Sequence, residues 1–423
     1  QAMTPDSQRP QVILSANVTH YYYAALALQR AGRLKRYICA IGVNPATRRG
    51  RLLLRLLPAG SHAKLATRDI SRFDAARVRT IWLPELLQRG GPRLGLISLD
   101  RGNWIVSHLF DWEASWSVDD CDIFHFVSST GLYSARKARQ RGCIVVCDER
   151  SEHPDYQLPL LRDEYARLNL VYNAPGLLTR KKTLSEYTAT DYLIVASSYA
   201  KKTYVEAGID EKRIFVVPYG VDLSQFNLAE QISPAQTQPK TDDGIFRIMY
   251  VGQMVPRKGV QYLIQAFEEM ALPNSELWLV GGGDGSLDRY IADHAASNPG
   301  IKLTGHVVKV DLFRYYNQAS VFVLPSLADA YGLVTLEAMA CGLPVIVTEN
   351  TGSKEAVRDG VDGYVIPIRD VGELKDRLRR LYMDPLLRLR MGEAAQLRAQ
   401  QFTWEAYGER LLAVYDEIMR RGR

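Results

Sequence analysis

The feature that most constrains the fold of this chain is an alternation of short apolar segments with longer amphipathic segments, which runs through the chain twice. Short apolar segments bounded by turn residues are typical of buried strands, and strands that alternate with helices predict a parallel sheet covered by helices. In the first half we expect strands at 12–16, 37–41, 123–127, 144–147, 193–196 and 214–218. In the second half we expect them at 246–251, 277–280, 301–303, 321–324, 344–347 and 363–366. The sequence therefore predicts an α/β protein with two doubly wound units.

A polar break separates the two units. Residues 227–244 hold two prolines and hardly any aliphatic side chain, which is typical of a linker. At 423 residues the chain is also too long for one compact core. We therefore predict a first domain at 1–226, a linker at 227–244 and a second domain at 245–401. Residues 402–423 are predicted to form a final amphipathic helix, with an apolar side made of Trp404, Tyr407, Leu411, Leu412, Tyr415 and Ile418.

The composition argues against several classes of protein. No apolar run approaches the roughly 18 residues that span a bilayer, and no secretory signal pattern opens the chain. The five cysteines are an odd and sparse set, which argues against a disulfide framework and fits a reducing cytoplasm. No histidine or cysteine cluster has the spacing of metal ligands, so we expect no metal site and interpret Cys143 and Cys147 as buried thiols.

Positive charge is concentrated between residues 46 and 81. Nine lysine and arginine residues stand there against Asp69 and Asp74, which gives the segment a charge of +7 in a chain whose net charge is +6. Residues 51–58 add an apolar cluster flanked by arginine, and a basic amphipathic segment can lie on anionic lipid. Three interpretations stay open, namely a solvated basic face, contact with an anionic membrane surface, and binding of an acidic soluble acceptor. We expect no nucleic-acid partner, because no recognised binding module accompanies the charge.

Two carboxylates mark a candidate ligand site within residues 322–348. Asp329 follows the predicted strand at 321–324, and Glu337 lies about one turn inside the predicted helix that comes next. In an open α/β sheet, ligands bind at the carboxyl ends of the strands, and free N–H groups at a helix start favour anions or hydroxyls. Both carboxylates could therefore face one ligand. The alternative interpretation is a solvated loop aspartate and an unrelated helix glutamate.

The same segment resembles the signature of the retaining glycosyltransferases of the GT-B fold, in the family called glycosyltransferase family 4 or group 1. The matching residues are Pro325, Ser326, Gly332, Glu337, Ala338, Met339, Ala340, Cys341, Gly342, Pro344 and Val345. Two positions depart from the signature, because Asp329 replaces a glutamate and Tyr331 replaces a phenylalanine. The resemblance implies two Rossmann-like domains that face each other across a cleft. It further implies that the first domain binds the acceptor, that the second binds a nucleotide-sugar, and that the last helix packs back on the first domain.

The resemblance also implies roles for the residues of this loop. Glu337 would accept hydrogen bonds from the two ribose hydroxyls of the nucleotide, and Asp329 would hold a hydroxyl of the donor sugar. Backbone N–H groups would bind the same sugar and the diphosphate; they belong to Ala330, Tyr331, Gly332 and Leu333. The ring of Tyr331 can alternatively serve in packing.

A second loop, at 252–259, carries cations at the mouth of a predicted strand. Cations beside a helix N-terminus suit a diphosphate, whose charge grows as a glycosidic bond breaks. The resemblance implies that Lys258 stabilises the departing diphosphate, while Gln253 stands where the family has an arginine. Two interpretations of that replacement stay open, namely that Arg257 compensates for the lost charge and that the donor is held less tightly. A neutral amide donor contributes about 1 kcal/mol against roughly 1.5–3 for a charged one. The alternative interpretation is an arginine and a lysine in a surface turn.

Other candidate positions come from glycine-rich and histidine-containing loops. Gly283, in the run GGGDGS at 281–286, is a candidate for close approach to the nucleotide, although such a run can also be a simple turn. His153 lies in a loop where the family commonly has an active-site histidine, and loop structure is its alternative role. His20 lies where the family has a glycine pair that is absent here, and His125 is interpreted as a packed strand residue. The turn PYGVDLSQF at 218–226 resembles the family's interdomain hinge.

These observations favour a retaining, metal-independent hexosyltransferase that uses a nucleotide-sugar, with a UDP-sugar preferred over a GDP-sugar and no further cofactor. We expect a glycan, glycolipid or lipid-linked acceptor, a role in cell-surface polysaccharide or glycoconjugate synthesis, and a cytoplasmic location that includes the inner face of the membrane. One alternative is a nucleotide-sugar epimerase on the same fold, for which convincing catalytic sets in both domains are not visible. Another is a non-catalytic sugar-binding subunit, which Asp329 and Gln253 keep open.

Overall fold

The computed structural model describes residues 9–17, 21–40, 42–44, 47, 69–82, 84, 99–172, 177–225 and 243–422. Three of the positions singled out above lie outside these residues. They are His20, the basic and apolar run at 48–68, and nearly all of the predicted linker. Among the residues described, no helix is both long enough and apolar enough to span a bilayer.

The first half of the chain folds around a parallel sheet of seven strands in the order β3-β2-β1-β4-β5-β6-β7. The strands are β1 Val12–Ala16, β2 Leu34–Cys39, β3 Val78–Thr80, β4 Ile123–Val127, β5 Ile144–Glu149, β6 Tyr192–Val195 and β7 Ile214–Val216. The central strands β1, β4 and β5 are buried along their whole length, as expected for a sheet covered on both faces. The helices connecting these strands are α1 Tyr21–Arg30, α5 Leu99–Ser115, α6 Leu132–Gln140, α7 Pro154–Arg167, α8 Leu177–Ala189 and α9 Ser198–Glu206.

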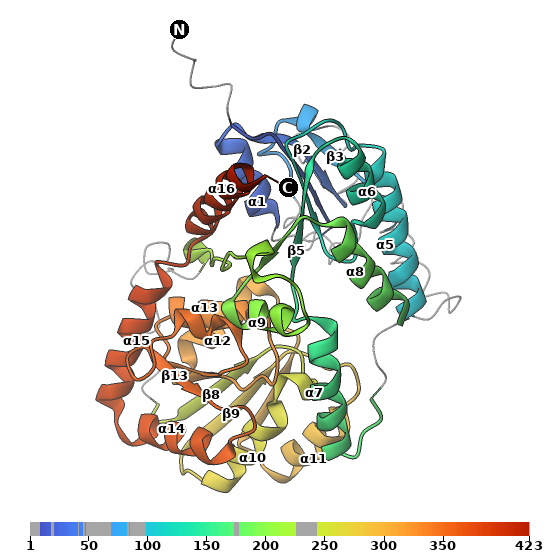
Figure 1. Ribbon diagram of the computed structural model, residues 1–423. Helices are drawn as coiled ribbons and strands as arrows, with labels where there is room; N and C mark the ends of the chain where they lie inside the picture. Colours follow the sequence, from blue (N-terminus) through green and yellow to red (C-terminus); the bar gives the residue numbers. More distant parts are fainter. Residues whose placement is uncertain are drawn as a thin grey trace.

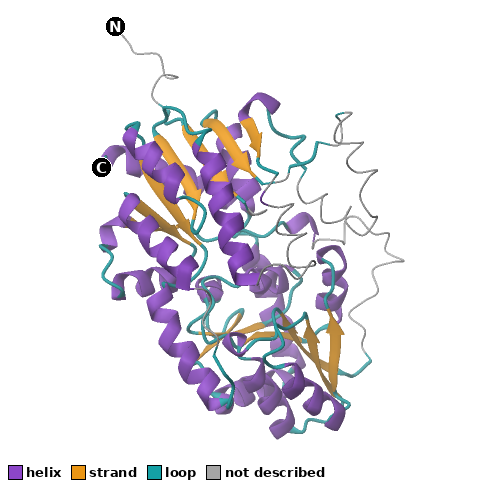
Figure 2. Cartoon of the chain, turned by 90° about the vertical axis from the view of Figure 1, so that its right-hand side faces the viewer, coloured by secondary structure: helices purple, strands orange, loops and turns teal. Residues whose placement is uncertain are grey.

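The second half folds around a parallel sheet of six strands in the order β10-β9-β8-β11-β12-β13. Its strands are β8 Phe246–Val251, β9 Ser275–Val280, β10 Ile301–Gly305, β11 Val321–Leu324, β12 Val345–Thr348 and β13 Gly363–Ile366. Its helices are α10 Val260–Met270, α11 Asp288–Ser297, α12 Lys309–Gln318, α13 Leu333–Ala340, α14 Val371–Met383 and α15 Pro385–Ala399. Figure 2 shows the two sheets in the upper and lower halves of the molecule, each flanked by helices. The predicted α/β class with two Rossmann-like units is confirmed.

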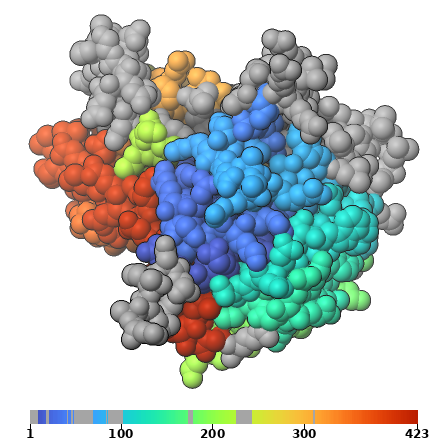
Figure 3. Space-filling model, turned by 90° about the horizontal axis from the view of Figure 1, so that it is seen from above, coloured from blue at the N-terminus to red at the C-terminus, as the bar shows by residue number. Residues whose placement is uncertain are grey.

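The last helix, α16 Trp404–Arg421, packs on the first domain beside α1 (Figure 1). Its contact with α1 is close, because a Cβ at Gly408 would lie 2.6 Å from the Cβ of Ala27. Arg33 donates to Asp416 at 2.7 Å, and His125 of β4 lies 2.5 Å from the Tyr415 hydroxyl. His125 is fully buried there as a packed strand residue. Seen from above, the blue N-terminal part of the chain lies between the red C-terminal part and the teal α5–α6 region (Figure 3).

The chain passes between the domains near Val221 and again near Phe402, and these two segments lie side by side. The amide of Val221, in the segment predicted as a hinge, donates to the Phe402 carbonyl at 2.8 Å, and Val221 pairs with Thr403 in an isolated parallel bridge. A Cβ at Gly220 would collide with the backbone of Thr403, so only glycine fits this approach.

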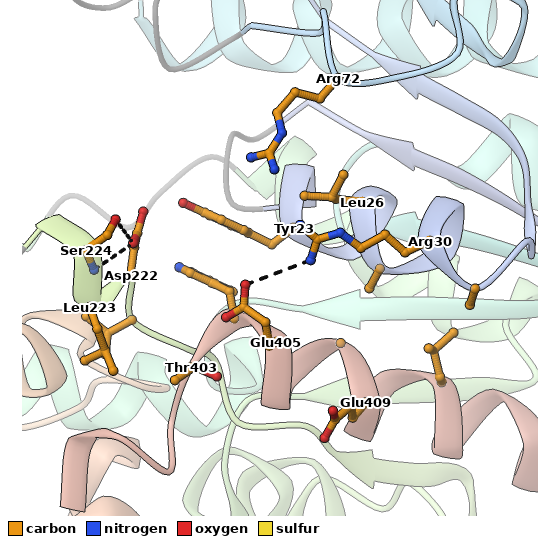
Figure 4. Close-up of a pocket in the computed structure, with 16 residues that line it drawn as sticks. Tyr23, Leu26, Arg30, Arg72, Asp222, Leu223, Ser224, Thr403, Glu405 and Glu409 are labelled. Carbon is orange, nitrogen blue, oxygen red and sulfur yellow. Dashed lines mark hydrogen bonds and ion pairs between the residues drawn. The ribbon is translucent and has the colours of Figure 1, made fainter. Parts of the chain in front are cut away.

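A cavity of about 570 Å³ opens next to this double crossing, between α1 and the start of α16 (Figure 4). Tyr23 and Trp404 stack in its wall with ring centroids 4.3 Å apart, and Arg30 lies 3.9 Å from Glu405. Burial, together with the nearby Asp222 carboxylate, raises the pKa of Tyr23 to about 12. The cavity belongs to the joint between the domains, because its lining comes from α1 and from the segments around Val221 and Trp404, with Arg72 added from the first domain.

Helix α7 follows a strand of the first sheet but packs against the second domain (Figure 1). Its Glu164 is fully buried and accepts hydrogen bonds from three second-domain side chains. The donors are Gln261 Nε2 at 2.8 Å, the Tyr262 hydroxyl at 2.8 Å and Arg369 Nε at 2.7 Å. The first half of the chain therefore contributes one helix to the packing of the second.

Candidate active site

The candidate site forms where the loops after two neighbouring strands meet. Strands β8 and β11 are paired in parallel, so the loops that follow them leave the same edge of the sheet. The loop after β8 leads into the short 3₁₀ helix η6, Pro256–Lys258, and the loop after β11 carries Asp329. Lys258 Nζ and Asp329 Oδ2 form an ion pair. Their side chains are only 13% and 12% exposed, so the pair is largely withdrawn from water.

Electrostatics keep Asp329 charged in spite of its burial. Burial acts to raise the pKa of its carboxyl, but the Lys258 ammonium and the Arg257 guanidinium outweigh that effect, and the pKa lies below its ordinary value. The ionised carboxylate is an acceptor-only group, so it suits a hydroxyl donor such as one from a sugar.

Backbone contacts hold the two loops together. Arg257 donates through Nη1 to the Ala328 carbonyl at 2.6 Å, and its own carbonyl accepts from the amide of Leu327 at 2.8 Å. Gly259 has φ +70°, and a Cβ there would collide with the carbonyl oxygen of Pro325. Arg257 is therefore a structural clamp between the loops as well as a source of positive charge.

The loop from Asp329 to Leu333 is fixed from both domains. The Ala330 carbonyl accepts from the hydroxyl of Ser197, a first-domain residue, at 2.7 Å. The Tyr331 hydroxyl donates to the Tyr219 carbonyl at 3.0 Å, and the two rings meet edge to face. Gly332 adopts φ +81° immediately before α13, which begins at Leu333 without a side-chain cap. Tyr331 thus serves interdomain packing, the alternative role that its sequence position left open.

Glu337 lies one turn inside α13 and is buried, with 7% of its surface exposed. The Tyr316 hydroxyl of α12 approaches its Oε2 at 3.3 Å. The carboxylate is therefore positioned by the helix and by a neighbouring hydroxyl at the same sheet edge as Lys258.

Gln253 and Gly283 lie on the adjoining loops. Both residues are exposed, and the Gln253 carbonyl accepts from the Tyr250 hydroxyl at 2.6 Å. Gly283 pairs with Met254 in an isolated bridge, and a Cβ at Gly283 would come within 2.6 Å of the carboxylate oxygen Oδ1 of Asp288. The glycine run therefore packs its backbone against the loop that leads to Lys258.

His153 occupies a structural position. Its Nδ1 accepts from the amide of Asp155 at 3.2 Å and so caps the start of α7, while its ring packs against Tyr187 and Tyr204. Burial lowers its pKa, which favours the neutral ring that this cap needs. No contact of His153 with Lys258 or Asp329 is found within the described part of the chain. The loop-structure interpretation describes it better than the catalytic one.

Glu152, the residue before His153, was not singled out from the sequence. It is 1% exposed, and it lies close enough to Arg257, Asp329 and Lys258 to interact electrostatically with all three. A glutamate in a polar loop of the sequence gives no sign that it is buried. Only the packing of α7 on the second domain shows the buried position of Glu152. No cluster of histidine, cysteine or acidic residues able to hold a metal ion occurs among the residues that the structure describes.

The two Rossmann-like domains give the chain the architecture of the GT-B fold. Residues 245–384 match the family model described as glycosyl transferases group 1. The resemblance to GT-B glycosyltransferases stated from the sequence is therefore confirmed.

Curated relatives agree with this assignment. The chain is 30% identical over 237 residues to a D-inositol 3-phosphate glycosyltransferase of Pseudarthrobacter chlorophenolicus, a match covering 53% of this chain and 56% of the relative. It is also 30% identical over 238 residues to a GDP-mannose-dependent monoacylated alpha-(1-6)-phosphatidylinositol monomannoside mannosyltransferase of Corynebacterium glutamicum, covering 53% of this chain and 61% of the relative. The chain thus spans little more than half the length of these relatives.

Solved structures share the fold over almost the whole chain. Sucrose-phosphate synthase from Thermosynechococcus elongatus superposes with a TM-score of 0.65 and 20% identity, covering 97% of this chain and 100% of the other. The Anabaena protein HepE in complex with UDP-glucose superposes with a TM-score of 0.62 and 15% identity, covering 96% and 99%. At these identities the likeness concerns the fold alone.

Proposed function

We propose that the protein is a retaining glycosyltransferase that moves a sugar from a nucleotide-sugar to a glycan, glycolipid or lipid-linked acceptor. The observation that carries the proposal is the Lys258–Asp329 ion pair, with Arg257 beside it, at the carboxyl ends of β8 and β11. This group of residues suits a sugar diphosphate. The cations complement the negative phosphates, and the carboxylate can accept a hydrogen bond from a sugar hydroxyl.

In the proposed reaction, the bond between the anomeric carbon and the diphosphate oxygen breaks while the acceptor oxygen forms its bond on the same face of the sugar. The acceptor proton passes to the departing phosphate oxygen, so the nucleoside diphosphate leaves with the electron pair of the broken bond. Lys258 and Arg257 stabilise the negative charge that grows on the leaving group. These two cations supply the positive charge there, and we propose that no metal ion is needed.

Each carboxylate has a proposed partner in the donor. Asp329 would exchange part of its contact with Lys258 for a hydroxyl of the sugar, and Glu337 would accept from the ribose hydroxyls. Asp329 is one methylene shorter than the glutamate of the family signature, so it reaches about 1.5 Å less far or binds through a water molecule. We therefore propose that Asp329 sets the donor preference.

The choice of donor and acceptor is supported by the names of similar proteins. The curated relatives include a GDP-mannose-dependent enzyme and a capsular polysaccharide biosynthesis glycosyltransferase of Staphylococcus aureus, and one structural neighbour is described with UDP-glucose. We propose a UDP-sugar over a GDP-sugar, and an acceptor in cell-surface glycan synthesis.

The test is a panel of UDP-, GDP- and ADP-sugars, measured by thermal shift and by release of the nucleoside diphosphate. One donor is expected to raise the unfolding midpoint and to be turned over, and NMR of the product is expected to show the anomeric configuration of the donor. Binding without turnover on any acceptor would favour the non-catalytic subunit, and a change of configuration within the nucleotide-sugar itself would favour the epimerase. A protein that binds none of the donors would contradict the proposal.

A further inference from the structure

Glu152 is a buried carboxylate of the first domain, and its two oxygens differ in their hydrogen bonding. Its Oε2 accepts from Gln157 Nε2 at 2.9 Å, whereas Oε1 has no hydrogen-bond partner among the described residues. The residue is 1% exposed, so water does not compensate freely. An unsatisfied buried acceptor is costly, and such a group in a native protein calls for an explanation such as a role in binding a ligand.

The fold brings this carboxylate to the site of the second domain. Glu152 stands two residues before α7, and α7 packs against η6, which carries Lys258. The Arg257 and Lys258 cations and the Asp329 carboxylate all act on its titration, although burial is the largest influence and raises its pKa. Glu152 therefore lies in the part of the first domain that packs on the second, within electrostatic range of the Lys258–Asp329 pair.

The charges around Glu152 restrict the group that it can bind. A phosphate would be repelled by this carboxylate and has Lys258 and Arg257 available instead. A carboxylate oxygen without a donor is complemented by an O–H or N–H group, and a sugar ring offers several hydroxyls within a small volume. A hydroxyl placed between the two domains satisfies the free oxygen and stays close to the phosphates that the cations hold.

We propose that Glu152 accepts a hydrogen bond from a hydroxyl of the donor sugar, so that one carboxylate from each domain, Glu152 and Asp329, holds the sugar that is transferred. This inference rests on the proposed function and names the first-domain half of the same site. It assigns Glu152 to substrate binding and to the selection of the sugar.

The experiment compares wild type with Glu152→Gln and with Asp163→Asn. Gln keeps the shape of the side chain and its contact with Gln157, but removes the charge and turns an amide donor toward the sugar. Asp163 lies on the same helix α7 and is half exposed, so Asp163→Asn removes the same charge without entering the site. Dissociation constants are measured by calorimetry for the nucleotide-sugar found in the donor panel and for its nucleoside diphosphate alone.

For Glu152→Gln we expect affinity for the nucleotide-sugar to fall at least about tenfold, as for the loss of a charged hydrogen-bond acceptor, with affinity for the nucleoside diphosphate within about twofold of wild type. Asp163→Asn is expected to match wild type with both ligands. The unfolding midpoint of Glu152→Gln should not fall, because the variant no longer buries a charge.

Other outcomes overturn the inference in distinct ways. Equal losses of affinity for the nucleotide-sugar and the nucleoside diphosphate would make Glu152 a structural residue. Unchanged affinity for the donor together with a raised KM for the acceptor would show that the hydroxyl bound by Glu152 belongs to the acceptor. Unchanged donor and acceptor parameters would remove Glu152 from the site. Failure of wild type to bind any nucleotide-sugar would refute the proposed function itself, which the wild-type measurement alone decides.

Discussion

The buried pair of Lys258 and Asp329 allows stability to be separated from catalysis. Lys258→Met keeps the length and the apolar stem of the side chain but leaves Asp329 without its ammonium. Removal of one partner of a buried ion pair costs about 3–5 kcal/mol, because the other charge stays uncompensated. Arg257 also acts on Asp329, so we expect the lower end of this range. For a domain of roughly 200 residues, about 3 kcal/mol lowers the unfolding midpoint by roughly 6–12 °C.

The double variant Lys258→Met with Asp329→Asn is expected to recover most of that stability. With both charges gone, neither side chain buries an uncompensated charge, and the unfolding free energy should return to within about 1 kcal/mol of wild type. Catalysis should not return, because the leaving diphosphate still lacks its cation. We expect the rate of transfer to stay about 100- to 1,000-fold below wild type in both variants, by analogy with the loss of an oxyanion donor.

The difference in stability between wild type and Lys258→Met is expected to depend on pH. In wild type the pKa of Asp329 is lowered, so its contribution to stability is present above the ordinary value of 3.8 and is lost as pH falls through the folded pKa. In Lys258→Met, burial acts against a single remaining cation, Arg257, and we expect the folded pKa to rise above 3.8. In this variant the contribution of Asp329 to the free energy of unfolding is then fully present below pH 3.8, and it is lost as pH rises through the raised pKa. The gap between wild type and variant should therefore widen from pH 4 to pH 8.

The assay is thermal unfolding of the four proteins of the cycle at pH 4, 6 and 8, with transfer rates measured at the pH of highest activity. Asp329→Asn alone serves as the control, because it removes the group whose titration causes the widening. A gap that stays constant with pH, or a double variant as unstable as Lys258→Met, would refute the account of the pair. Recovery of transfer in the double variant would remove Lys258 from the chemistry.

Four further predictions concern other parts of the molecule. Glu337→Ala should lower turnover at least about tenfold, since a charged acceptor for the ribose is lost, and unchanged steady-state kinetics would exclude that role. Burial raises the pKa of Glu149 from 4.5 to about 7, so the stability it allows is present below 4.5 and is lost as pH rises through 7. Denaturant unfolding of Glu149→Gln should therefore match wild type near pH 4.5 and exceed it by about 3 kcal/mol at pH 8; equal curves at pH 8 would contradict the shift. Gly259→Ala should destabilise the second domain by about 2 kcal/mol or more, because φ +70° and the Pro325 carbonyl both oppose a Cβ, and a melting curve identical to wild type would show that the loop can move. Neutralising the arginines of 48–55 should weaken sedimentation with anionic vesicles, whereas equal sedimentation would exclude this segment as an anchor.

The strands could be predicted from local pattern because most of them are buried on both faces. Strands β1, β4, β8, β11 and β13 have the bounds that the apolar runs predict. β3 was not predicted, since it is a three-residue edge strand, Val78–Thr80, whose side chains are all partly or fully exposed. A short half-exposed strand has no apolar run, and only its pairing with β2 defines it.

The second-domain half of the site could be predicted in part. The order of strands places β8 beside β11, and this pairing brings Lys258 to Asp329, which no local pattern states. The resemblance gave the two residues neighbouring roles, but not the direct ion pair between them. Their pairing means that Asp329 is both a ligand candidate and the counter-ion of the proposed catalytic cation.

In the first domain, the sequence singles out His153, whereas the residue that we propose for the sugar site is its neighbour Glu152. His153 was chosen because histidine is common in the corresponding family loop, yet its ring is fixed as the cap of α7. Glu152 precedes the cap and is buried within electrostatic range of Arg257, Lys258 and Asp329. A sequence cannot show this difference, because the direction of each side chain depends on where α7 begins and on what it packs against.

The position of Glu152 depends on contacts remote from the sugar site. Helix α7 is anchored to the second domain through Glu164, which binds Arg369 and the α10 side chains Gln261 and Tyr262. Because Glu152 lies just before the other end of α7, the same anchor helps to fix its position where α7 packs against η6, which carries Lys258. In two-domain enzymes, closure around the ligand completes the site. If Glu152 holds the sugar as we propose, the completing residue belongs to a segment that already packs on the second domain, and the contacts of Glu164 help to position both Glu152 and Asp329.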